Sequence, residues 1–163
     1  MARGRRRIDW FRLGVALGLP FVVAAIGGAV TTNSIETWYA GLVKPAFSPP
    51  NWLFAPAWTA LYFLMGIAFY RVIRGGVRTM NQEAATEFFV LQLGLNLAWS
   101  VVFFGFRQPD FALVVILLLL LFIIGTVLCF RSIDRAAALL LVPYFIWVSF
   151  ATYLNLQIVL LNS

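Results

Sequence analysis

The side chains that most often carry out acid–base or metal chemistry are scarce in this sequence. Its 163 residues include no histidine, one cysteine and six carboxylates. These counts exclude a histidine-based acid/base site, a His/Cys zinc site and a disulfide within the chain. Cys129 is expected to be a buried free thiol. Glu83 and Glu87 stand at the expected start of a helix, where acids suit the helix dipole, so we interpret them as structural. We therefore expect no catalytic residue, no metal site and no obligatory cofactor.

Aromatic and amide side chains form a second set of candidates. Along residues 88–106, a rotation of 100° per residue places four side chains within a sector of about 60°. These side chains are Gln92, Asn96, Trp99 and Phe103. Amides are costly in hydrocarbon, so we expect both of them to face a bundle interior or a cavity. Gly94 and Ala98 fall on the opposite side, where small residues allow another helix to approach closely, including one from a second subunit.

Two further segments carry aromatic residues along one helical face. In the last segment the face comprises Tyr144, Trp147, Ala151, Leu154, Asn155 and Ile158. Between residues 52 and 70 it comprises Trp58, Tyr62, Met65 and Phe69. Such faces fit ordinary core packing. They also fit an apolar cavity with a few polar groups, which would suit a large, flat hydrophobic ligand. The residues alone leave both interpretations open.

The elements that must position these residues are membrane helices. Hydrophobic residues make up 63% of the chain and charged residues 11%, whereas soluble domains are roughly 45–50% apolar and roughly 25% charged. Five stretches free of interior charge are long enough to cross a bilayer, and in hydrocarbon such continuous stretches must be helical. We predict an all-α membrane protein, a bundle of five transmembrane helices in a single domain spanning residues 1–163. The helices are expected at about 11–30, 51–72, 84–106, 109–131 and 135–161.

The distribution of basic residues predicts the orientation of this bundle. Of the 12 lysines and arginines, only Lys44 and Arg107 fall on the side opposite the N-terminus. The others are Arg3, Arg5, Arg6, Arg7, Arg12, Arg71, Arg74, Arg78, Arg131 and Arg135. The positive-inside rule then places the N-terminus in the cytoplasm. The basic residues behind the net charge of +6 are explained as this orientation signal, which also gives some attraction to anionic lipid. No nucleic-acid partner is therefore expected.

Loops, prolines and glycines complete the expected topology. The longest loop, residues 31–51, lies outside the cell. Pro20, Pro56 and Pro143 each remove a backbone donor and favour a kink. Gly14 and Gly18 form a GxxxG pair, which predicts close packing within the chain or, as a second possibility, dimerisation.

Three stretches of the chain together resemble the TspO/MBR family, the tryptophan-rich sensory proteins of bacteria and the related translocator protein (peripheral-type benzodiazepine receptor) of mitochondria. They are WYAGLVKPAFSPPNWLFAPAWTALY at 38–62, NLAWSVVFFG at 96–105 and PYFIWVSFATYLN at 143–155. The resemblance implies a five-helix bundle in the cell membrane of a bacterium, commonly dimeric. It also implies a pocket that is open towards the loop between the first two helices.

The resemblance also implies ligands and a binding site. Family ligands include protoporphyrin IX and haem, synthetic drugs and, in eukaryotic members, sterols. The residues carried over by motif are Trp38, Tyr39, Trp58, Tyr62, Asn96, Trp99, Trp147, Ala151 and Asn155, and the helical faces add Phe103 and Leu154. The sterol motif of eukaryotic members needs a basic residue after the tyrosine, and none follows Tyr153, so sterol binding through that motif is not expected.

The first functional hypothesis is therefore a membrane protein that binds tetrapyrroles and transports or senses them. Its partners would be the porphyrin or another flat hydrophobic molecule, membrane lipid and a second copy of the chain. Two alternatives stay open: light-dependent degradation of the bound porphyrin, and regulation of a partner protein that responds to the ligand. The sequence offers no acid/base apparatus, so enzymatic activity would be photochemical at most.

Overall fold

The fold is known from a computed structural model that describes residues 8–75 and 79–162. Its α-helices are α1 (Trp10–Ile35), α2 (Phe54–Ile73), α3 (Met80–Ser100), α4 (Pro109–Ile133), α5 (Arg135–Leu140) and α6 (Val142–Asn162). Two short 3₁₀ turns, Tyr39–Gly41 and Asn51–Leu53, lie in the first connection, and a π-helical turn, Val101–Gly105, extends α3. The described residues contain no strand, and five spans are long and apolar enough to cross a membrane. This confirms the predicted five-helix membrane bundle.

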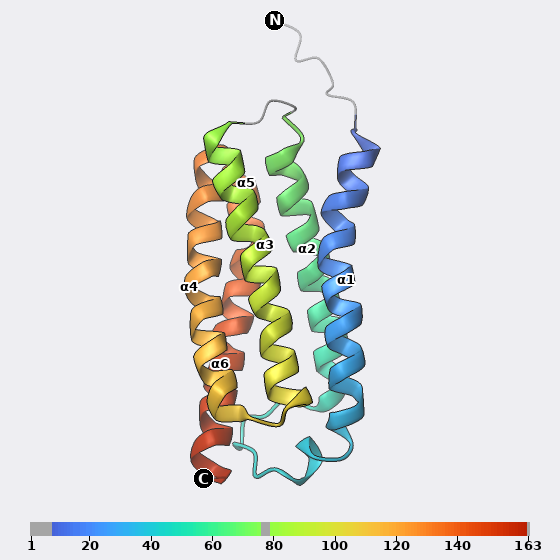
Figure 1. The fold of residues 1–163 in the computed structure, drawn as a ribbon, viewed down its shortest axis with the longest axis vertical. Helices are drawn as coiled ribbons and strands as arrows, with labels where there is room; N and C mark the ends of the chain where they lie inside the picture. The colour runs from blue at the N-terminus through green and yellow to red at the C-terminus, as the bar shows by residue number, and fades with distance from the viewer. Residues whose placement is uncertain (1–7, 76–78, 163) are drawn as a thin grey trace, which may run out of the picture.

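The long helices run side by side along one axis (Figure 1). In the bundle α1 packs against α2 and α3, and α4 packs against α3 and α6. The connections after α2 and α4 lie at one end, here called the arginine end after Arg71, Arg74, Arg131 and Arg135. The connections after α1 and α3 lie at the other end, here called the loop end. The arginines at 3, 5, 6, 7 and 78 lie outside the described residues, and the cytoplasmic side of the bundle stays a prediction.

The first helix is longer than expected. It begins after Asp9, whose side chain accepts a hydrogen bond from the backbone of Arg12, and it continues to Ile35 rather than ending near residue 30. Thr31 and Thr32 were expected in the loop. Their hydroxyls instead donate to backbone carbonyls one turn earlier, at distances of 2.7 and 2.8 Å, which keeps both residues in the helix. The first connection is therefore shorter than predicted.

Two other helix boundaries differ from the prediction for identifiable local reasons. The third span begins at Met80 because Thr79 and Gln82 form a capping box, which satisfies backbone donors at the helix start. The fifth span is interrupted between α5 and α6, just before Pro143. Proline has no N–H to continue the helical ladder, so the predicted disturbance at Pro143 takes the form of a break. Helix α1, by contrast, is continuous through Pro20.

Close helix packing involves glycines other than the predicted pair. A Cβ atom at Gly66 of α2 would lie 2.6 Å from a side-chain carbon of Leu17 in α1, so the two helices touch there. At Gly14 and Gly18 a Cβ would meet no described atom within 4 Å. The prediction that this pair packs within the chain was wrong, because α1 turns its Ala16 face, and not its Gly14 face, towards α2.

The arginine end of the bundle has a solid aromatic core. The rings of Phe69 and Phe89 are stacked with centroids 4.3 Å apart, and Phe130 stacks on Phe89 at 5.8 Å. Met65 beside them has no exposed surface. Offset stacking of this kind adds to the stabilisation that burial of apolar surface provides. This core joins α2, α3 and α4.

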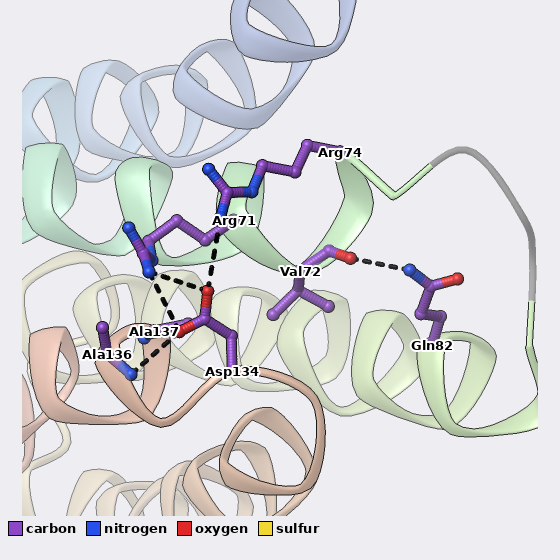
Figure 2. Close-up of polar contacts among 7 residues, drawn as sticks. All are labelled: Arg71, Val72, Arg74, Gln82, Asp134, Ala136 and Ala137. Atoms are coloured by element: carbon purple, nitrogen blue, oxygen red, sulfur yellow. Dashed lines mark hydrogen bonds and ion pairs between the residues drawn. The ribbon is translucent and has the colours of Figure 1, made fainter. Parts of the chain in front are cut away.

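A group of polar contacts, the Asp134 clasp, closes the arginine end above that core (Figure 2). One oxygen of Asp134 lies 2.8 Å from Nη2 of Arg71 and 3.7 Å from Nη2 of Arg74. The other accepts backbone hydrogen bonds from Ala136 and Ala137 and so caps α5. Burial opposes ionisation of Asp134, but the Arg71 contact and the backbone donors outweigh it and lower the pKa of this carboxyl. The clasp thus ties α2 to the start of α5.

Candidate ligand pocket

A cavity of about 300 Å³ lies between the helices at the loop end. Its walls come from α1, α2, the end of α3 with the π-helical turn, and α6, and Tyr39 from the first connection contributes to them. This volume is at the lower end of the range of small-molecule pockets, roughly 300–1,000 Å³. Several lining residues of α1, of α2 and of the 3₁₀ turn before α2 are exposed, so the cavity opens between α1 and α2. They are Gly28, Thr32, Asn51, Ala55 and Thr59.

Most of the predicted site residues line this cavity. They are Tyr39, Trp58, Tyr62, Trp99, Phe103, Ala151, Leu154 and Asn155. Trp38, Asn96 and Trp147 do not line it. The three aromatic faces identified along the sequence therefore converge, and they do so at one end of the bundle only.

The three remaining residues lie directly behind the wall. The ring of Trp38 meets Phe103 edge-on at 5.6 Å, and that of Trp147 meets Trp58 edge-on at 6.5 Å. Asn96 accepts a 2.6 Å hydrogen bond from the hydroxyl of Tyr62. Their positions support the lining rings and hold them in place. Nε1 of Trp147 is buried and has no hydrogen-bond partner among the described residues.

Two pairs of rings dominate the cavity wall. On α2, Trp58 and Tyr62 are stacked with centroids 5.5 Å apart and planes inclined by 28°. On the third span, Trp99 and Phe103 have centroids 5.5 Å apart, inclined by 32°. Flat, rigid rings give a large apolar contact area at low entropic cost. A planar ligand could stack against these surfaces.

The amides of the predicted site fix the helices relative to one another. Oδ1 of Asn155 accepts a hydrogen bond from the indole of Trp99 at 3.1 Å, and its Nδ2 donates to the carbonyl of Pro109 at 2.8 Å. Asn96 links the hydroxyls of Tyr62 and Tyr144, and Tyr144 donates to Gln92. Because these groups are buried, such bonds avoid the large cost of an unpaired amide. The amides of Asn96 and Asn155 are thus engaged within the protein, whereas Nε2 of Gln92 is buried without a hydrogen-bond partner among the described residues.

The π-helical turn shapes the wall at the end of the third span. The backbone N–H of Phe106 donates to the carbonyl of Val101 at 2.8 Å, which is the wider bonding pattern of a π-helix. The hydroxyl of Ser34 in α1 donates to the carbonyl of Phe104 at 2.7 Å. These bonds anchor the turn to α1 and hold the buried ring of Phe103 at the cavity.

Sequence reasoning missed the wall that α1 provides. Its lining residues are Ala24, Gly27, Gly28, Thr31, Thr32 and Ile35, and Ser100 of α3 was missed as well. The available signal was the run of small residues at the end of the first span, which leaves space opposite bulky rings.

The first connection covers the cavity through Tyr39, whose side chain is 6% exposed. Nζ of Lys44 lies 4.5 Å from the centre of the Tyr39 ring, within the range of a cation–π contact. Burial raises the pKa of the Tyr39 hydroxyl, so that group stays neutral at ordinary pH. The side chain of Asn162 makes two hydrogen bonds of 3.0 Å with the backbone of Val43. The connection is therefore attached to the end of α6.

Comparison with known proteins agrees with this architecture. The TspO/MBR family profile matches residues 16–161. The chain is 43% identical over 150 residues to the tryptophan-rich protein TspO of Chlorobaculum tepidum, covering 92% of this chain and 95% of the relative. It is 39% identical to the tryptophan-rich sensory protein of Cereibacter sphaeroides, covering 95% and 94%. It is 38% identical to the translocator protein of Bos taurus, covering 84% and 82%. The bacterial relatives indicate the cell membrane as its location, and the chain is a multi-pass membrane protein that belongs to the TspO/MBR family.

Proposed function

We propose that this protein binds a porphyrin in the cavity at the loop end and that it transports or senses this ligand. Membership of the TspO/MBR family supports a membrane sensory or translocator role. The observation that carries the finer proposal is the convergence on one cavity of a stacked ring pair from α2 and a tilted ring pair from the third span. A planar, largely apolar ligand is what such a wall fits best.

Stacking and shape would hold the porphyrin. The chain has no histidine, which is the usual axial ligand of haem iron. The hydroxyl of Tyr62 at the cavity already donates to Asn96. We therefore expect metal-free protoporphyrin IX to bind about as tightly as haem. We expect Lys44, whose Nζ lies 4.5 Å from the centre of the Tyr39 ring, to meet a propionate of the ligand.

Filling the cavity from α1 is the sharpest test. Gly28 lines the cavity, and a Cβ there would meet no described atom within 4 Å, so the leucine side chain of Gly28→Leu starts in open space and adds volume at the cavity wall. Gly18→Leu is the matched control on the same helix, because Gly18 has equally open space but does not line the cavity. Leucine also favours a helix over glycine, so neither variant is expected to misfold.

The readout is quenching of tryptophan emission on titration with protoporphyrin IX. We expect micromolar binding at the tightest for the unmodified chain, an order-of-magnitude estimate for a partly open apolar site. Gly28→Leu should raise the Kd about tenfold or more, which corresponds to about 1.4 kcal/mol. Gly18→Leu should leave the Kd unchanged. Equal quenching by both variants would place the porphyrin elsewhere.

Light-dependent degradation of the ligand is a second candidate, because the oxidisable rings of Trp58, Tyr62 and Trp99 all line the cavity. Illumination of the same titrated samples distinguishes degradation from binding alone. The measurement is the decay of the porphyrin Soret band. Decay faster than for free porphyrin, and abolished in Gly28→Leu, would support degradation. Decay at the rate of the free pigment would leave binding with transport or sensing.

We also propose that the chain forms a homodimer through the Gly94 and Ala98 face of α3. Gly94 is exposed, and a Cβ there would meet no described atom within 4 Å. Small residues on an exposed membrane face allow two helices to approach closely. Cross-linking in membranes should yield a dimer that Gly94→Leu weakens, and an unchanged dimer in that variant would exclude this face.

A further inference from the structure

We propose that the outer surface of α4, α5 and α6 at the arginine end is a binding site for one anionic phospholipid. The headgroup would be held by Arg131 and Arg135. One acyl chain would lie in the α4–α6 groove, an apolar depression of about 160 Å³ formed by Ile124, Val127, Leu128, Val142 and Phe145. This site lies outside the cavity described above and shares no residue with it.

The groove is built where the fifth span is interrupted. Val142 is the first residue of α6, directly after the break that precedes Pro143, and it lines the groove together with Leu128 of α4. Leu128 is 60% exposed and Val142 is 40% exposed. All five lining residues are apolar, and the chain spans a membrane, so lipid is the medium that meets this surface.

The two arginines lie in line with the groove. Along α4, residues three, four and seven apart share one helical face, which places Arg131 on the same face as Ile124, Val127 and Leu128. At 1.5 Å per residue, Arg131 stands about 10 Å from Ile124 along the helix axis. Arg135 begins α5 on the other side of the short connection. A phosphate at the arginines would thus leave its acyl chain running down the groove.

The guanidinium groups of Arg131 and Arg135 form no ion pair with a described carboxylate, so both can bind a phosphate. All six carboxylates of the chain lie among the described residues, and none is within 4.0 Å of a guanidinium nitrogen of Arg131 or Arg135. The neighbouring carboxylate, Asp134, is already engaged by Arg71 and Arg74 (Figure 2). An anion at Arg131 and Arg135 would therefore meet two exposed cations and a carboxylate that is already paired.

A charge test uses the full chain, delipidated in detergent and analysed by native mass spectrometry with dioleoyl-phosphatidylglycerol and dioleoyl-phosphatidylcholine at equal concentrations. We expect the first bound lipid to be phosphatidylglycerol, with a preference of about tenfold from two nearby cations. The double variant Arg131→Gln, Arg135→Gln should reduce this preference to under about twofold. The control Lys44→Gln, Arg107→Gln removes the same charge from the loop end and should preserve it. If both double variants lose the phosphatidylglycerol preference equally, the proposal is overturned. The preference would then come from general electrostatic attraction between the basic chain and anionic lipid.

A groove test separates a lipid from a simple phosphate contact. Leu128→Trp fills the groove, and Leu121→Trp is its control because Leu121 is 63% exposed on the same helix but does not line the groove. We expect Leu128→Trp to lower phosphatidylglycerol retention severalfold and Leu121→Trp to leave it unchanged. Equal retention in both would overturn the groove as an acyl-chain site and leave a headgroup contact that inorganic phosphate should displace. Unchanged thermal unfolding would show that each variant is folded.

Discussion

The two ends of the bundle use the same helices in opposite ways. At the loop end, rings from α2 and the third span line a cavity, and the amides of Asn96 and Asn155 fix the helix positions. At the arginine end, stacked phenylalanines fill the space between α2, α3 and α4, and the Asp134 clasp closes the top. The comparison teaches that aromatic content alone does not indicate a binding site. What matters is whether small residues stand opposite the rings.

The largest expected effect comes from removing one phenylalanine from the solid core. Phe89 has no exposed surface, and Phe89→Ala should lower the free energy of unfolding by about 3 kcal/mol or more, since a cavity forms where none existed. Porphyrin quenching should be unchanged while the protein is folded. Unfolding in mixed micelles with increasing sodium dodecyl sulfate gives the free energy.

The matched substitution at the loop end is Phe103→Ala. Phe103 is 3% exposed, but one side of it faces existing empty space. We expect a smaller loss of stability than for Phe89→Ala, together with weaker porphyrin quenching. If the two variants lose the same stability and bind porphyrin equally well, the contrast between the two ends is wrong.

An intermediate effect is expected from the Asp134 clasp. Asp134→Asn keeps a side-chain oxygen that can cap α5 but removes the charge that Arg71 and Arg74 contact. The free energy of unfolding should fall by about 2 kcal/mol at pH 7, the size of a hydrogen bond to a charged group. Asp110→Asn, at an exposed carboxylate on the opposite end, should change it less.

The clasp also predicts a pH dependence. The folded pKa of Asp134 is lower than that of an unfolded aspartate, which is about 3.9. Its contribution is therefore fully present above that value and is lost as the pH falls through the folded pKa. The same unfolding measurement between pH 6 and acid conditions should show a loss that Asp134→Asn lacks. Parallel curves for the two proteins would contradict this role.

The smallest effect on stability and on porphyrin affinity is expected from removing the hydroxyl of Tyr62, which lies between the cavity and the rest of the bundle core. The ring of Tyr62 lines the cavity, and its hydroxyl donates to Asn96 in the network that runs on to Tyr144. Tyr62→Phe should cost about 1 kcal/mol of stability, as for one buried hydrogen bond, and change porphyrin affinity less than twofold. A tenfold loss of affinity would mean that the hydroxyl itself contacts the ligand.

Much of this fold could be predicted from the sequence because the bilayer imposes a simple rule. Each crossing needs about 20 apolar residues, and a rotation of 100° per residue then assigns faces, which is why Trp58, Trp99 and Asn155 were expected near one another. The structure brings these three residues to one cavity. The boundaries at Ile35 and Met80 were missed because hydroxyls and a capping box, rather than hydropathy, determine them.

The rest of the site depends on which side chains, or which empty space, lie between neighbouring helices. Helical periodicity gives the direction of a side chain but does not predict what it meets there. Asn96 has the expected inward direction, but Tyr62 lies between it and the cavity. The wall from Gly27 to Thr32 was missed because small residues leave no hydrophobic signal, although the space that they leave is the cavity. Gly14 and Gly18 match a packing motif, yet neither contacts another helix among the described residues.

Because of the π-helical turn at Val101–Gly105, the third span could lose one residue and remain helical, and such a loss would change the pocket. The wider bonds of this turn hold one residue more per turn than an α-helix does. A chain with one residue deleted here could restore ordinary α-helical bonding with its backbone donors still satisfied. Because the π-helical turn takes up one extra residue, the residues after it would keep their directions, whereas the residues within the turn would change the ring that faces the cavity. Members with and without such a deletion could thus keep the same membrane bundle and present different rings, in place of Phe103, to whatever enters the cavity.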